Sequence, residues 1–151
     1  MLDIKLLKKL REETGISIAL CKKALEQSNN DLKKAKVLLN QWGVEKVKDK
    51  MNRTTSAGAI FSYVHHNKKV ASLIELMSET DFVSGNSEFQ KIGQELAMQV
   101  ASVEAKNTEK LLEQQYIRDP SKKVSDLIKE AVLKFGENIK IGRFARWELG
   151  T

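Results

Sequence analysis

The sequence is short of the residues that cross-links, rigid turns and membrane spans require. Its 151 residues include one cysteine, Cys21, and one proline, Pro120. One cysteine cannot form a disulfide within the chain, and no cluster of cysteine and histidine has the spacing of a zinc site. No apolar run approaches the ~20 residues that span a bilayer. We therefore expect no disulfide, no metal, no cofactor and no membrane partner.

The composition is that of a folded domain, with 41% hydrophobic and 30% charged residues. The first residues, MLDIKLLKKLREE, are charged throughout and lack the apolar segment of a signal peptide. These features predict a cytoplasmic protein.

The net charge of +6 is unevenly placed along the chain. Residues 1–57 hold 13 Lys and Arg against 7 Asp and Glu, whereas residues 58–151 hold 13 against 13. Such asymmetry favours either an acidic partner, nucleic acid included, or a solvated basic face. Because residues 44–58 carry no interleaved aromatic residues for base stacking, we expect no direct nucleic-acid contact.

The first 43 residues have the apolar periodicity of three short helices. Start signals stand at Asp3, Ser17 and the Asn29-Asn30-Asp31 cluster, and Gly43 is the expected end of the third helix. Helices of about ten residues do not stand alone, so these three must pack as one small domain. Residues 44–57 then lose the apolar period and gain Lys, Arg, Ser and Thr, which predicts a partly helical basic linker.

Residues 58–151 are predicted to form an α+β core. Two β-rich segments at 58–66 and 70–79 flank a short turn and predict a hairpin, and helical spacing recurs at 86–103 and 121–136. A last strand at 139–150 would complete a three-stranded antiparallel sheet covered by helices on one face. Alternation in that strand places five residues on one side, opposite Gly142 and Phe144: Ile139, Ile141, Ala145, Trp147 and Leu149.

Nothing in the sequence indicates covalent catalysis. His65 and His66 are adjacent, so on a strand their side chains would point to opposite faces. Gly85 and Gly93 lack the spacing of a phosphate-binding loop, and no nucleophile elbow is present. We therefore expect that the protein is not an enzyme.

The stretch SETDFVSGN, residues 78–86, joins the predicted hairpin to the next helix and sets an acid beside a large aromatic residue. One interpretation makes Phe82 a core anchor and Asp81 a cap of the turn. The other has the turn present Phe82 to a partner. The residues alone leave both interpretations open.

Three ordered blocks carry a resemblance to a known family. They are LREETGISIALCKKALEQSNNDLKKAKVLLNQWG, then GAIFSYVHHNKKVASLIELMSETDFVSGNSEFQ, and finally GENIKIGRFARWELG. Together they resemble elongation factor Ts, in which the hairpin leads into Glu-Thr-Asp-Phe-Val. The first block is also similar to ubiquitin-associated three-helix modules, and the blocks divide the chain into domains at 1–43, 44–57 and 58–151.

The resemblance implies a guanine-nucleotide exchange factor of translation elongation, which binds elongation factor Tu carrying GDP and promotes exchange for GTP. It implies that Thr80, Asp81, Phe82 and Val83 displace the partner's Mg²⁺, with Phe82 as a wedge. A second contact in the N-terminal domain is implied at the segment that contains Ile16, Ile18, Ala19 and Leu20, where the sequence GISIAL departs from the family's more usual methionine-rich stretch.

The chain also differs from longer family members, which carry a second copy of the core. Short members restore the missing surface by pairing two chains, so the last strand is a candidate seam of a homodimer. Ala145 stands where dimeric relatives can have a cysteine, which predicts a non-covalent dimer. Two rival functions remain: a basic RNA- or ribosome-binding protein, and a ubiquitin-associated-like adaptor.

Overall fold

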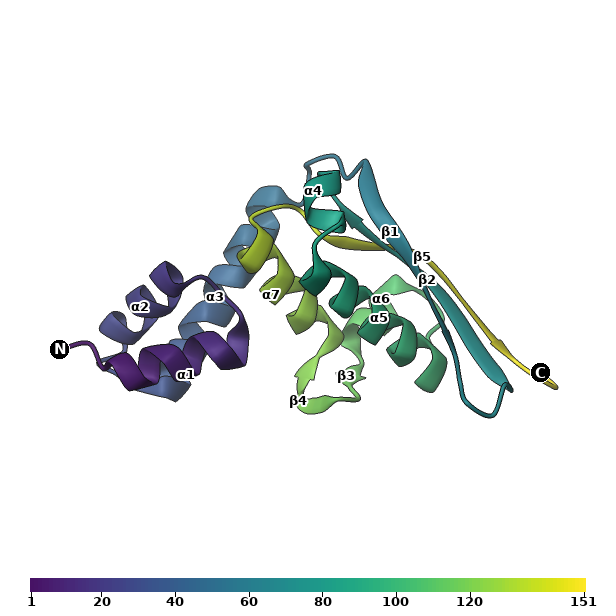
Figure 1. The fold of residues 1–151 in the computed structure, drawn as a ribbon, viewed down its shortest axis with the longest axis horizontal. Coiled ribbons are helices and arrows are strands. Elements are labelled where there is room, and N and C mark those ends of the chain that lie inside the picture. Colours follow the sequence, from purple (N-terminus) through teal and green to yellow (C-terminus); the bar gives the residue numbers. More distant parts are fainter. The chain divides into compact units, whose positions relative to one another are not determined.

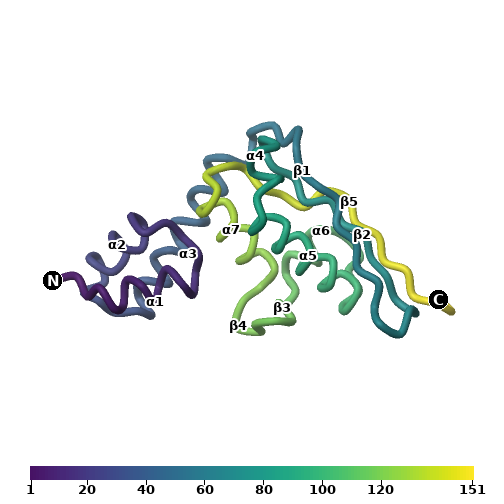
Figure 2. The backbone as a smooth tube through the Cα atoms, in the orientation of Figure 1, coloured from purple at the N-terminus to yellow at the C-terminus, as the bar shows by residue number.

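A computed structural model describes all of residues 1–151, and the chain forms two compact units. Unit 1 comprises Met1–Asn52 and Lys129–Glu137, and unit 2 comprises Arg53–Ile128 and Asn138–Thr151. Figure 1 labels the helices and strands of both units, and Figure 2 traces the same backbone as a tube.

Unit 1 contains α1 (Ile4–Thr14), α2 (Ile18–Gln27) and α3 (Leu32–Lys50). The predicted caps are confirmed, because the side chains of Asp3, Ser17 and Asp31 each accept a hydrogen bond from a backbone N–H of the first turn that follows.

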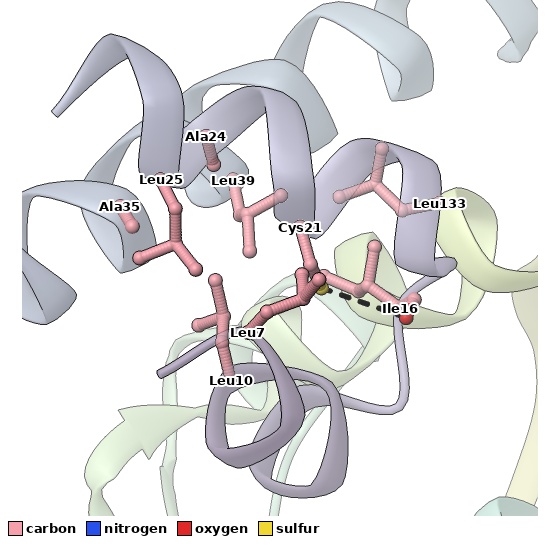
Figure 3. Close-up of a cluster of buried hydrophobic side chains, with 9 residues drawn as sticks. All are labelled: Leu7, Leu10, Ile16, Cys21, Ala24, Leu25, Ala35, Leu39 and Leu133. Carbon is pink, nitrogen blue, oxygen red and sulfur yellow. Dashed lines mark hydrogen bonds between the residues drawn. The ribbon is translucent and has the colours of Figure 1, made fainter. Parts of the chain in front are cut away.

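The core of unit 1 is an apolar cluster drawn from α1, α2 and α3, together with Ile16 between α1 and α2 and Leu133 from a later helix (Figure 3). Cys21 belongs to this cluster, and its thiol donates to the carbonyl oxygen of Ile16 at 3.6 Å. Burial raises the pKa of the Cys21 thiol, so the side chain acts as a small packing group rather than a nucleophile. The cluster consists of Leu7, Leu10, Ile16, Cys21, Ala24, Leu25, Ala35, Leu39 and Leu133.

The predicted end of the third helix at Gly43 is wrong, because α3 continues to Lys50. Gly43 is buried, and a Cβ there would lie 3.2 Å from Leu133 and 3.3 Å from Lys129. Both neighbours belong to α7 (Val124–Phe135), whose second half is part of unit 1. The glycine therefore permits close approach of two helices and does not stop one.

Unit 2 is built on an antiparallel sheet of order β1-β2-β5, formed by β1 (Ala57–Val64), β2 (Val70–Ser78) and β5 (Lys140–Glu148). The helices α5 (Ser87–Ser102) and α6 (Thr108–Glu113) pack on one face of the sheet (Figure 1). The predicted α+β class, with a helix-covered three-stranded sheet, is confirmed.

The two faces of the sheet differ sharply in burial. Ile74 and Leu76 of β2 are buried with Phe89 and Leu96 of α5 on the helix-covered face. The opposite face exposes four large apolar side chains, which we call the open face: Ile60 (65% exposed), Val64 (58%), Leu73 (52%) and Trp147 (81%).

The predicted alternation of the last strand is partly wrong, because the register of β2 against β5 shifts between Ile74 and Leu76. Ile141 pairs with Leu76 and is buried, whereas Ala145 pairs with Leu73 and is exposed. An extra residue in one strand moves every later side chain to the other face. Phe144 therefore lies opposite buried Ile74, and Ala145 and Trp147 point to the open face.

The connection between α5 and α7 holds α6 and a small hairpin of β3 (Gln115–Tyr116) and β4 (Asp119–Lys123), none of which the sequence predicted. The fully buried amide of Gln99 donates to the carbonyl oxygen of Gln115 and accepts from the N–H of Ile117, both at 3.0 Å. Burial, together with the nearby Glu95 carboxylate, raises the pKa of Tyr116 to about 12. Buried polar groups thus fix this segment where apolar periodicity is absent.

Candidate functional site

The stretch between β2 and α5 forms a short helix, α4 (Asp81–Ser84). Thr80 caps it, because its Oγ1 accepts from the N–H of Val83 at 3.4 Å. The Ser78 hydroxyl donates to the carbonyl oxygen of Thr80 at 2.9 Å, and the N–H of Gly85 donates to that of Asp81 at 2.9 Å. The turn is therefore held at its start and its end.

Adjacent residues of α4 face opposite environments. Val83 is 5% exposed and packs inward, whereas Phe82 is 88% exposed. The interpretation of Phe82 as a core anchor is therefore wrong. A rigid turn that buries its valine and exposes its phenylalanine presents a large apolar group to solvent, as protein-interaction sites do.

Asp81 lies beside Phe82 in the first turn of α4 and is exposed. It borders a hollow of about 290 Å³ that is also lined by Gly58 of β1 and Glu75 of β2. Arg143 forms two hydrogen bonds from its side chain to Glu75, which lowers the pKa of that carboxyl. The surroundings of Phe82 on the side of Asp81 are thus polar, and the Glu75 carboxylate there is paired with Arg143.

We predict that Thr80→Ala destabilises α4, because the first turn loses its side-chain acceptor. The expected cost is about 1 kcal/mol of local stability. Faster hydrogen exchange of the Val83 amide would show it, and Thr80→Ser, which keeps the hydroxyl, serves as the control. Equal protection in Thr80→Ala and the unsubstituted protein would contradict the assigned cap.

A second set of contacts lies directly before α4. The backbone N–H of Asn138 donates to Oε2 of Glu79 at 2.5 Å, and the Asn138 side-chain amide donates to the carbonyl oxygen of Arg53 at 2.9 Å. The Arg53 guanidinium lies 3.7 Å from the same Glu79 oxygen. The contacts among Arg53, Glu79 and Asn138 were not predicted from the sequence. The one available signal was a polar Asn between the helix-ending Gly136 and an apolar strand.

The four N-terminal candidate residues differ in exposure. Ile16 is 1% exposed and belongs to the core of unit 1, and Leu20 is half-buried. Ile18, at 53% exposed, and Ala19 begin α2 at the surface. Only Ile18 and Ala19 thus offer freely accessible side chains on this segment.

The two adjacent histidines do not lie on opposite faces, because β1 ends at Val64 and both residues follow it. Their rings are 4.1 Å apart, and the Tyr63 hydroxyl is 2.8 Å from Nδ1 of His65.

No group of three or more His, Cys, Asp or Glu side chains lies together in a way that could hold a metal ion. None of the helices has the length and apolar character that a membrane span requires.

Known proteins match both regions that contain candidate residues. Residues 2–46 match the family described as elongation factor Ts, mitochondrial, N-terminal, and residues 79–151 match the family described as elongation factor TS. Elongation factor Ts of Thermosipho melanesiensis is 36% identical over 195 aligned positions, which cover 99% of this chain and 100% of the relative. The chain belongs to the elongation factor Ts family.

Other members of the elongation factor Ts family are equally similar. The Thermotoga maritima protein is 38% identical across 99% of this chain and 96% of its own length, and the Coprothermobacter proteolyticus protein is 35% identical across 96% of each. The alignment with the Thermosipho protein, at 195 positions, is longer than the 151 residues of this chain. These relatives therefore carry segments that this shorter family member lacks.

Proposed function

We propose that the protein is a guanine-nucleotide exchange factor that binds elongation factor Tu carrying GDP and promotes GDP release and GTP entry. The observation that carries this proposal is the exposure of Phe82 on a braced turn, in a chain that belongs to the elongation factor Ts family. Its place of action is the cytoplasm, where translation elongation proceeds.

Exchange of this kind needs coupling between two binding events and no covalent chemistry. A protein that binds the nucleotide-free partner more tightly must weaken nucleotide binding by the same factor. Phe82 supplies a large apolar wedge for a pocket of the partner, and burial of such a side chain contributes about 1.5–3 kcal/mol. Asp81 offers a carboxylate beside Phe82. Thr80 and Val83 stabilise the turn that carries Phe82, because Thr80 caps it and the Val83 side chain is buried. The proposed result is displacement of the partner's Mg²⁺.

We further propose a second contact through the start of α2. Ile18 and Ala19 are exposed there and lie in the region that matches the N-terminal family description. Ile16 and Leu20 support this contact from within, because one is buried and the other half-buried. We also propose that the chain divides into domains at 1–43, 44–57 and 58–151. The contact at the start of α2 then belongs to the first domain, and the contact at Phe82 belongs to the last.

The decisive experiment measures release of a fluorescent GDP analogue from elongation factor Tu. We expect the protein to accelerate release in a concentration-dependent manner at fixed Mg²⁺. Because the proposed mechanism removes Mg²⁺, excess Mg²⁺ should reduce the acceleration. Absence of any acceleration, together with RNA binding that weakens steeply with salt, would instead favour the rival RNA-binding function.

We also propose that two copies of the chain pair through the open face. The cross-strand row of Val64, Ala71 and Trp147 is apolar, and the next row joins Leu73 and Ala145 to the small, uncharged Ser62. The charges of Glu75 and Arg143 on this side of the sheet are already paired with each other. When two open faces meet across a twofold axis, these paired charges therefore add no unpaired like charges to the interface. We infer that a second copy of the chain binds this face.

Sedimentation equilibrium tests this pairing. We expect a dimer at tens of micromolar and a monomer for Leu73→Glu, because a carboxylate would be buried between two apolar faces. Ile117→Glu, at an exposed position of the β3–β4 hairpin, is the control and should leave the dimer intact. A monomeric unsubstituted protein would contradict the proposal.

A further inference from the structure

We propose that Glu79 and Asn138 are positioning residues that fix α4, and with it the exposed ring of Phe82. This inference rests on the proposed function of Phe82. In this inference, contacts among three residues that are distant in the sequence stabilise the turn that carries Phe82. These residues are Arg53 before β1, Glu79 after β2, and Asn138 before β5.

The hydrogen bonds identify which contact dominates. The Asn138 N–H donates to Oε2 of Glu79 at 2.5 Å, so a charged acceptor meets a backbone donor. Arg53 is 3.7 Å from the same oxygen, and its side chain is 53% exposed. Exposed ion pairs contribute little. The bond from Asn138 to Glu79 is therefore the principal tie, and Arg53 mainly balances the charge.

The side chain of Asn138 fixes the third segment. Asn138 is only 3% exposed, and its Nδ2 donates to the carbonyl oxygen of Arg53 at 2.9 Å. Removal of this amide would deprive the Arg53 carbonyl oxygen of this donor, and loss of a hydrogen bond of this kind costs about 0.5–1.5 kcal/mol. Asn138 thus joins the segment before β1 to the residue after β2 through two hydrogen bonds of its own.

These ties act on α4 because Glu79 is the residue immediately before its cap. The Thr80 carbonyl oxygen accepts from Ser78, and the N–H of Asn86 donates to the carbonyl oxygen of Val83 at 3.0 Å. With Glu79 fixed, both ends of the turn are anchored, and the backbone of α4 sets the direction in which the Phe82 side chain leaves the turn. Pre-orientation of an interaction group reduces the entropy that binding must overcome.

The unit boundaries give the trio a second significance. Arg53 and Asn138 are each the first residue of unit 2 where the chain leaves unit 1. Two of the three residues that support the Phe82 turn, Arg53 and Asn138, thus open the two segments of unit 2.

Amide hydrogen exchange and GDP release together test the inference. Asn138→Ala and Glu79→Ala should lower the protection of the α4 amides of Val83 and Ser84 about tenfold, while amides at the centre of α5 stay protected. Glu79→Gln, which keeps an acceptor for the Asn138 N–H, should retain most of the protection. Gln99→Ala removes another buried amide of unit 2 and should leave α4 protected.

In the GDP-release assay we expect Asn138→Ala to reduce the maximal acceleration about fivefold at equal folded fraction. In a Phe82→Ala background the same substitution should cause no further loss, because a positioning residue acts only through the residue it positions. Unchanged α4 protection in Asn138→Ala, or an equal loss in both backgrounds, would overturn the inference. Failure of the unsubstituted protein to accelerate GDP release would overturn the proposed function instead. The amide hydrogen-exchange data would still decide whether Asn138 fixes α4.

Discussion

Phe82→Ala is expected to reduce the acceleration of GDP release by roughly 10- to 100-fold. The ring is 88% exposed in the free protein, so any apolar area that it buries is gained only on the partner. Loss of about 1.5–3 kcal/mol of burial corresponds to this range, since 1.4 kcal/mol equals a factor of ten. Stability should change by less than about 0.5 kcal/mol, as at other exposed positions.

Two further variants serve as controls for Phe82→Ala. Phe82→Leu retains part of the apolar volume and should recover part of the activity. Ile117→Ala truncates an exposed apolar residue of the β3–β4 hairpin and should leave exchange unchanged. Full activity in Phe82→Ala would refute the wedge, whereas an equal loss in Ile117→Ala would indicate a general effect of lost apolar surface.

Gly58→Ala is expected to destabilise the protein strongly, by about 2–6 kcal/mol. Gly58 has φ +145°, where an L side chain is strained by about 1–3 kcal/mol. A Cβ would also collide with the carbonyl oxygen of Leu76 and lie 2.9 Å from Cα of Met77. Both atoms are backbone of the paired strand, so β1 would have to move away from β2, which adds about 1–3 kcal/mol.

Two other glycines separate these contributions in thermal or urea unfolding. Gly136 has φ +70° with nothing within 4 Å of an added Cβ, so Gly136→Ala measures strain alone. Gly93 lies in α5 without positive φ, and a Cβ there would meet the ring of Phe61. Because a ring can turn aside, Gly93→Ala should cost less than Gly58→Ala. Equal melting temperatures for Gly58→Ala and Gly136→Ala would show that the strand contact is not decisive.

The sequence predicted those parts of the fold that local patterns determine. The caps at Asp3, Ser17 and Asp31 and the apolar period of α5 need only neighbouring residues, and they were confirmed. The role of Gly43 was predicted wrongly, because the sequence does not distinguish a glycine that permits close helix packing from a glycine that ends a helix. Its partner, Leu133, lies far along the chain.

Long-range contacts also explain the other differences. The bulge opposite Glu75 depends on the pairing of β5 with β2, so alternation read within β5 could not reveal it. The turn at 80–84 was identified as a site, but the residues alone did not decide whether Phe82 points inward or outward. The support from Asn138 was not visible, since two hydrogen bonds across distant segments leave no periodic signal.

The central position of β2 has a consequence for how the chain folds. Its pairing with β1 is local, so we expect it to form early, whereas β5 follows α4 to α7 in the chain and is expected to pair later. Until then the second edge of β2, with the sequence VASLIELMS, offers unpaired backbone groups and apolar side chains to other chains. We therefore expect the central strand of the finished sheet to be open to aggregation during folding until β5 pairs with it.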